Sequence, residues 1–131
     1  MEKKSEEIKI LIAEDEAPLL QILTDQITEA GLQVVGAKNG EEGLKLAQSE
    51  HPDLMLVDIL MPKMDGLSMI AEIRKIPELK NTPVIVLTNL NDPASTARAL
   101  EVGAYDYIVK TDTDIEDVVK RIKEKLGLNN P

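Results

Sequence analysis

The chain has 131 residues, no cysteine, a single histidine and a formal net charge of −9. This length fits one domain, the lack of cysteine excludes disulfides and thiolate metal sites, and the acidic balance argues against direct nucleic-acid binding. No apolar run approaches the roughly 20 residues of a membrane span, and the charged first residues do not resemble a signal peptide, so a cytoplasmic location is expected.

Five apolar runs alternate with five segments of helical periodicity. The predicted strands cover residues 8–13, 33–37, 54–58, 83–88 and 105–109. This alternation predicts an α/β domain, with a doubly wound parallel sheet covered by helices on both faces. The domain is expected over residues 8–126, between a charged tail at 1–7 and a short tail at 127–131.

Local signals mark where several helices begin or end. Asn39 stands three residues before a glutamate, as in a capping box, and Asp92 precedes a proline. Gly31 follows the first helical segment and predicts its end, and Asp114 is expected to cap the last helix.

Polar residues follow four of the five predicted strands. They are Glu14 and Asp15, Asp58, Thr88, and Lys110. In an open parallel sheet the carboxyl ends of the strands meet at one edge, which is where such folds place their sites. Three carboxylates this close together repel one another unless they bind a proton or a cation, and all-oxygen ligands favour Mg²⁺. Because His51 is the only histidine, a zinc site built on histidines is excluded.

The lone carboxylate at the end of the third strand suggests a role in phosphoryl transfer. Asp58 could attack phosphorus and form an acyl phosphate, with Lys110 neutralising the transferred oxygens and Thr88 bonding one of them. Each residue also has an ordinary alternative. Glu14 and Asp15 could cap a helix, Lys110 could be a surface lysine, and Thr88 a simple strand end.

Four motifs together resemble the receiver domain of bacterial two-component response regulators. They occupy residues 10–16, 52–66, 83–88 and 103–110, in the family's order and spacing. The resemblance implies a flavodoxin-like (βα)5 fold with strand order 2-1-3-4-5. It also implies that Asp58 accepts a phosphoryl group from a sensor histidine kinase or phosphotransfer protein. Beyond its own phosphorylation and dephosphorylation, such a domain is not an enzyme.

The same resemblance assigns further roles around Asp58. Mg²⁺ would be bound by Asp15 directly, by Glu14 through water, by Asp58, and by the backbone carbonyl of Leu60. Lys110 would bind the phosphoryl group, while Thr88 and Tyr107 would form the switch pair that signals to a downstream protein target. No direct nucleic-acid or membrane partner is expected.

The sequence departs from the family pattern at four positions. Thr111 follows Lys110 where the family usually has a proline with a cis peptide bond, which leaves the direction of the ammonium open. Asn89 replaces a very small residue and is expected to slow phosphorylation by small donors. Leu60 and Leu90 stand where neither can orient a hydrolytic water, which predicts a long-lived phosphoryl state.

Three alternatives remain open at this point. The domain could be an interaction module that keeps the fold but signals without phosphorylation, as Thr111 and Asn89 allow. A Mg²⁺-dependent phosphohydrolase of the haloacid dehalogenase type would need a second aspartate where Leu60 stands. A flavin-binding protein is less favoured, because residues 14–18 offer no phosphate-binding loop.

Overall fold

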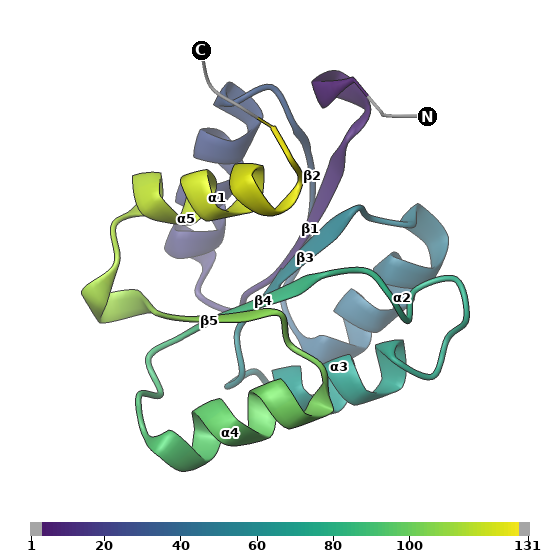
Figure 1. Ribbon diagram of the computed structural model, residues 1–131, viewed down its shortest axis with the longest axis vertical. Helices are drawn as coiled ribbons and strands as arrows, with labels where there is room; N and C mark the ends of the chain where they lie inside the picture. The colour runs from purple at the N-terminus through teal and green to yellow at the C-terminus, as the bar shows by residue number, and fades with distance from the viewer. Residues whose placement is uncertain (1–3, 129–131) are drawn as a thin grey trace.

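The apolar runs of the sequence form five parallel strands in the computed structural model, which describes residues 4–128 (Figure 1). The strands are β1 (Lys9–Ala13), β2 (Gln33–Ala37), β3 (Leu54–Val57), β4 (Val84–Thr88) and β5 (Asp106–Val109). They lie in the order β2-β1-β3-β4-β5, which confirms the predicted sheet topology. The last residues of β1 and β3, Ala13 and Val57, are paired, so the segments that follow them start side by side.

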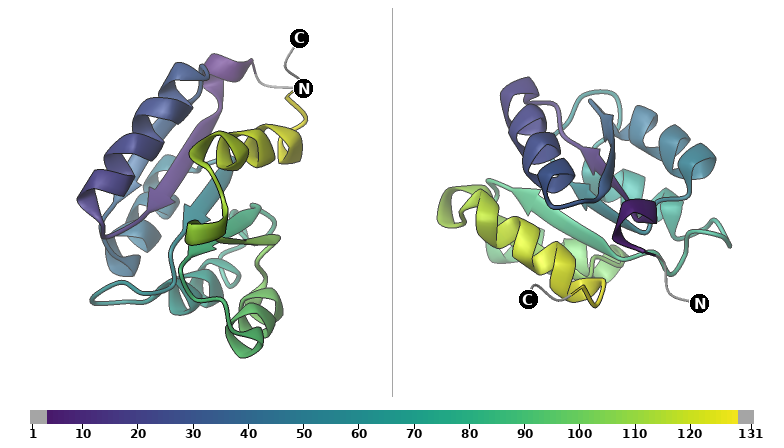
Figure 2. Two further views of the ribbon diagram at one scale, coloured as in Figure 1. Left: turned by 90° about the vertical axis from the view of Figure 1, so that its left-hand side faces the viewer. Right: turned by 90° about the horizontal axis from the view of Figure 1, so that it is seen from above.

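Five α-helices cover the two faces of this sheet. They are α1 (Ala17–Glu29), α2 (Gly40–Glu50), α3 (Gly66–Ile73), α4 (Pro93–Val102) and α5 (Ile115–Lys125). Two short 3-10 helices, η1 (Ser5–Glu7) and η2 (Lys110–Asp112), were not predicted from the sequence. Helices α1 and α5 lie on one face, and α2, α3 and α4 lie on the other (Figures 1 and 2).

Two of the predicted helix caps form and one does not. The side chain of Asn39 accepts a hydrogen bond from the amide of Glu42 at 2.8 Å, and Asp92 accepts one from the amide of Ser95 at 2.9 Å. Asp114 occupies the cap position of α5, but its side chain makes no capping bond, so that prediction was wrong. The amide of Asp117 donates to the backbone carbonyl of Asp114 instead, at 3.0 Å.

The core lies on both faces of β3, the central strand. All four residues of β3 are buried, as expected for a parallel strand with helices on either side. Leu54 and Leu56 pack with residues of α1 and α5, whereas Met55 and Val57 pack with residues of α2, α3 and α4. Each such buried side chain contributes roughly 1.5–3 kcal/mol of transfer free energy, so the strand that leads to Asp58 is firmly held.

A single arginine joins three segments at the amino edge of the sheet. The guanidinium of Arg74, just after α3, donates to the carbonyl of Thr82 at 2.8 Å and to that of Gly103 at 2.7 Å. It also donates to the carbonyls of Lys80 at 3.1 Å and Leu79 at 3.3 Å. These bonds fix the connection into β4 and the connection into β5 relative to α3.

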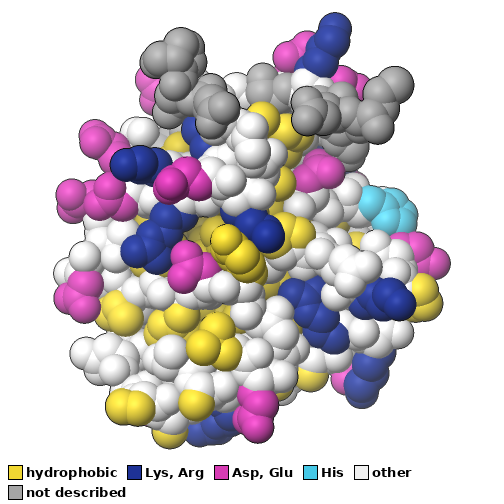
Figure 3. All heavy atoms as spheres, viewed as in Figure 1, with side chains coloured by type: hydrophobic (Ala, Val, Ile, Leu, Met, Phe, Trp, Pro, Cys, Tyr) yellow, Lys and Arg dark blue, Asp and Glu magenta, His cyan; other side chains and the backbone are white. Residues whose placement is uncertain are grey.

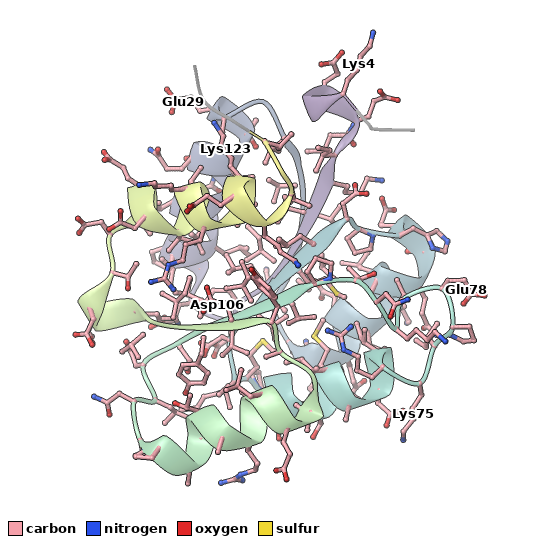
Figure 4. The ribbon with its side chains drawn as sticks, viewed as in Figure 1. Lys4, Glu29, Lys75, Glu78, Asp106 and Lys123 are labelled. Atoms are coloured by element: carbon pink, nitrogen blue, oxygen red, sulfur yellow. The ribbon has the colours of Figure 1, made fainter. Side chains whose placement is uncertain are left out.

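Charged side chains of both signs are interspersed on the face shown in Figure 3. Asp106 on β5 pairs with Arg121 on α5, with 3.2 Å between Oδ2 and Nη1 (Figure 4). Tyr105 was predicted to begin β5 but precedes it. The residue is 55% exposed, and the Lys125 ammonium lies 3.9 Å from the centroid of its ring. Within residues 4–128, no helix has the length and apolar character needed to cross a membrane.

Candidate phosphoryl-acceptor site

The carboxyl ends of the strands bring the predicted polar residues together at one edge of the sheet. A shallow pocket at this edge is lined by Asp15, Glu16, Asp58, Leu60, Thr88, Asn89 and Lys110. Buried Glu14 adjoins it through an ion pair with Lys110. These residues come from the ends of β1, β3, β4 and β5, so the convergence follows from the order of the strands.

Asp58 directly follows β3 and is almost completely enclosed, at 5% exposure. Its amide donates to the carbonyl of Ala13 at 3.0 Å, which holds the residue against the end of β1. Its Oδ2 lies 2.8 Å from the Nζ of Lys110. Its Oδ1 is buried and has no hydrogen-bond partner within the described part of the chain. A buried carboxylate oxygen without a partner is costly, and this one is therefore available to a ligand.

Gly66 explains how the following loop packs so closely against Asp58. A Cβ built at Gly66 would overlap the backbone carbonyl oxygen of Asp58, so the absence of a side chain is required there. Asp65 caps α3 by accepting from the amide of Ser68 at 2.8 Å, which fixes the same turn. Asp65 and Gly66 therefore both shape the turn that leads into α3.

Lys110 binds three carboxylates at once. Its Nζ lies 2.8 Å from Glu14, 2.7 Å from Glu16 and 2.8 Å from Asp58. Burial alone would lower the pKa of Lys110, but the hydrogen bonds to Asp58, Glu14 and Glu16 outweigh it and raise the pKa well above its usual range. The ammonium therefore stays charged and partly neutralises the carboxylates around it.

The peptide bond after Lys110 is trans, since residues 4–128 contain no cis peptide bond. Lys110 begins η2, and its side chain reaches Asp58 without a following proline. The absence of that proline therefore does not turn the ammonium away from the site.

The cluster of carboxylates in the structure contains Glu16 in place of Asp15, which was predicted together with Glu14 and Asp58. Carboxylate oxygens of Glu14, Glu16 and Asp58 all lie within 4.8 Å of one another, an arrangement that could hold a metal ion. Asp15 is exposed and lines the same pocket. Burial raises the pKa of Glu14, although hydrogen bonds from Lys110 and from the amide of Glu16 act in the opposite direction.

The oxygen atoms of this site are of the kind that binds a divalent cation. Carboxylate oxygens are the ligands that Mg²⁺ prefers, and the unpartnered Oδ1 of Asp58 supplies one that is already free. Three carboxylates against one ammonium leave an excess of negative charge. The residues therefore suit such an ion. Glu16 was missed from the sequence, where the acidic run at residues 14–16 was the available signal.

Thr88 and Tyr107 are linked through the connection between β4 and α4. Thr88 is buried, and its Oγ1 lies 3.5 Å from the amide of Leu90. The hydroxyl of Tyr107 donates to the carbonyl of the same Leu90 at 2.6 Å, and burial raises the pKa of this phenol. A displacement of Leu90 would therefore affect both predicted switch residues.

Comparisons with known proteins agree with this arrangement. A family model described as "Response regulator receiver domain" matches residues 10–123. A "Probable transcriptional regulator ycf27" from Porphyridium aerugineum is 38% identical over 128 residues, covering 93% of this chain and 52% of the relative. The chain thus spans about half the length of that curated relative.

Two solved structures have the same fold. The signal receiver domain of a signal transduction histidine kinase from Syntrophus aciditrophicus has a TM-score of 0.83 at 35% identity, covering 91% of this chain and 89% of the other. A CheY-like response regulator receiver domain protein from Methanospirillum hungatei has a TM-score of 0.85 at 28% identity, covering 92% and 94%.

Proposed function

Because this chain belongs to the family of response regulator receiver domains, we propose that Asp58 accepts the phosphoryl group. The observation that carries the proposal is the state of its carboxylate. One oxygen is bonded to Lys110, and the other is buried without a hydrogen-bond partner among the described residues. A carboxylate held in this way can act as the nucleophile of a phosphoryl transfer.

The proposed donor is a phosphohistidine on a histidine kinase or phosphotransfer protein. An oxygen of Asp58 forms a bond to phosphorus while the phosphorus–nitrogen bond of the donor breaks. The electron pair of the broken bond stays on the histidine nitrogen, which takes up a proton. The product is an acyl phosphate on Asp58. Such a transfer depends mainly on positioning and on neutralising the phosphoryl oxygens, and the charged Lys110 is placed to do the second.

We propose that Glu14, Asp15 and Asp58, with the backbone carbonyl of Leu60, hold Mg²⁺. When bound, the cation supplies positive charge for the oxygens of the transferred group. The buried carboxylate of Glu14 is already positioned for this role, because an ion pair with Lys110 and a hydrogen bond from the amide of Glu16 at 3.0 Å hold it in place. The pocket position of Asp15 is consistent with its assigned role.

The proposed output is a conformational switch through Thr88 and Tyr107, which alters the surface offered to a downstream protein target. Both residues depend on Leu90, so a movement of Thr88 toward the phosphoryl group would disturb the hydrogen bond of Tyr107. New charge at Asp58 would thus bias an element with two arrangements. The only chemistry proposed for the domain is the gain and loss of its own phosphoryl group.

The phosphoryl group is expected to be long-lived. Leu60 lines the pocket and is 60% exposed, and neither Leu60 nor Leu90 has a side chain that can orient a water molecule by hydrogen bonding. Intact-mass measurements after removal of the donor would follow the loss of the phosphoryl group. Complete loss within seconds would contradict this expectation.

The experiment that tests the proposed function is intact-mass measurement after incubation with phosphoramidate and Mg²⁺. One added phosphoryl group, removable by hydroxylamine as expected for an acyl phosphate, would support the proposal. It should be absent in Asp58→Asn and in EDTA, and present in the matched surface variant Asp25→Asn. An adduct that persists in Asp58→Asn would contradict the site. No adduct from small donors or from a panel of histidine kinases would favour a phosphorylation-independent interaction module.

A further inference from the structure

Glu16 makes the most exposed of the three ion pairs around Lys110. The side chain of Glu16 is 54% exposed, whereas those of Glu14 and Asp58 are 2% and 6% exposed. An ammonium group has three hydrogen-bond donors and no more. Lys110 donates hydrogen bonds to Glu16 at 2.7 Å and to Asp58 at 2.8 Å, and Glu14 lies 2.8 Å from the same Nζ as an ion pair, so three carboxylate oxygens occupy the space around the ammonium.

A phosphoryl oxygen can therefore bind Lys110 only by displacing one of its present partners. Glu14 is a poor candidate, because breaking its ion pair would leave a buried carboxylate without compensation. Asp58 is the acceptor itself. Glu16 can exchange the ammonium for water at little cost, since it is half exposed to solvent. The bond to Glu16 is the one that an incoming phosphoryl group most easily replaces.

Glu16 also adds negative charge at the entrance. It lines the pocket together with Asp15 and Asp58, and its carboxylate lies within 4.8 Å of those of Glu14 and Asp58. Charge of one sign concentrated in a pocket repels small ligands of the same sign and lowers their rate of association.

We propose that Glu16 is a specificity-determining residue of the phosphoryl transfer. Glu16 occupies the position on Lys110 that a phosphoryl oxygen takes, and it thereby selects against small, highly anionic phosphodonors. The inference rests on the proposed function of Asp58 and adds a role that the sequence did not reveal. Glu16 acts through Lys110 and through its charge, and it takes no part in bond making. A donor delivered by a protein has interface energy to offset this barrier, whereas a small free donor does not.

The test compares Glu16→Gln with the unaltered protein under saturating Mg²⁺, by following the initial rate of phosphorylation against donor concentration. Two donors are used, acetyl phosphate and phosphoramidate, because acetyl phosphate carries more negative charge at neutral pH. The matched control is Glu78→Gln, an exposed glutamate on the connection between α3 and β4, remote from the carboxyl edge (Figure 4).

The expected result is a rise of about threefold or more in the rate with acetyl phosphate, in line with the strength of an exposed ion pair. The rise should be smaller with phosphoramidate, should diminish at high salt, and should be absent in Glu78→Gln. An unchanged or slower rate in Glu16→Gln would overturn the inference, and a slower rate would instead make Glu16 a ligand of the cation. Equal gains with both donors would overturn the claim of donor selection.

A second readout needs neither donor nor metal. Nitrogen-15 NMR of the lysine ammonium groups in EDTA, with the Lys110 signal assigned by its loss in Lys110→Ala, reports the exchange of its protons with water. Glu16→Gln should speed that exchange, because it removes the charge of one of the three partners. Unchanged exchange would overturn the inference. If the unaltered protein takes up no phosphoryl group from any donor, the proposed function fails; if it does, and Glu16→Gln behaves identically, only this inference fails.

Discussion

Replacement of Asp58 by asparagine is expected to stabilise the metal-free protein by about 1 kcal/mol at neutral pH. The buried carboxylate of Asp58 attracts Lys110 across 2.8 Å, which is worth about 6 kcal/mol at an effective dielectric constant near 20. The carboxylates of Glu14 and Glu16, within 4.8 Å, repel it by about 3.5 kcal/mol each at the same dielectric constant, with the exposed Glu16 contributing less. Attraction and repulsion therefore nearly cancel.

The remaining contribution to the difference in stability between the two proteins is the free-energy cost of burying the negative charge of Asp58. Asp58 is 5% exposed, and its Oδ1 has no partner among the residues that the structure describes. An asparagine amide of the same shape still accepts a hydrogen bond from Lys110 and costs less to remove from water. The substitution thus removes the free-energy cost of burying this charge, which a bound cation would further offset.

The assay is urea denaturation followed by far-ultraviolet circular dichroism, in EDTA and in MgCl₂. In EDTA the midpoint of Asp58→Asn should lie above that of the unaltered protein. In MgCl₂ the order should reverse, because a cation bound to the native state at a hundred times its Kd adds about 2.7 kcal/mol, and the variant loses a ligand. Asp25→Asn, at an exposed position on α1, should stay within about 0.5 kcal/mol under both conditions. A lower midpoint for Asp58→Asn in EDTA would refute the reasoning.

Three further substitutions test the segment that follows Asp58 and the acidic cluster. Gly66→Ala should lower the unfolding free energy by about 2–3 kcal/mol and slow phosphorylation, because its methyl group would overlap the carbonyl oxygen of Asp58, while Gly36→Ala should be tolerated better; urea midpoints and intact mass measure both. Lys63→Gly should raise the free energy of unfolding by about 0.5 kcal/mol, since Lys63 has a φ of 68°, whereas Lys45→Gly within α2 should lower it by about 1 kcal/mol. Because burial raises the pKa of Glu14 above its usual 4.5, the stability that this carboxyl contributes is present below pH 4.5 and is lost as the pH rises through the raised pKa. Metal-free protein should therefore lose stability over that window relative to Glu14→Gln, in urea midpoints taken at stepped pH, and parallel curves for the two proteins would contradict this.

The parts of the fold that depend on neighbouring residues could be predicted from the sequence. Asn39 and Asp92 form their caps with amides three residues away, so the pattern and the contact lie in the same short segment. The convergence of Asp58 with Lys110 followed from the alternation of strands and helices, and the strand order from the family resemblance. Both are consequences of a topology in which few arrangements are possible.

The parts that depend on distant residues could not be predicted. Glu16 bonds to Lys110, a residue 94 positions away, and the sequence does not say which acid of the run at 14–16 will face it. Nothing periodic marks η2 at Lys110, because a single turn of 3-10 helix is too short to carry a pattern. Tyr105 was expected inside β5 because aromatic residues favour strands, but it packs beneath Lys125 at the surface instead.

The chain has two tyrosines and no phenylalanine or tryptophan, and the tyrosines are separated by one residue at the start of β5. Tyr107 reports on the backbone beside Thr88 through its bond to Leu90, and Tyr105 reports on the end of α5 through Lys125. Near-ultraviolet absorption and tyrosine emission from this protein therefore come from a single corner of the molecule. A Tyr105→Leu variant is a protein with one natural fluorophore, placed where the proposed switch would move.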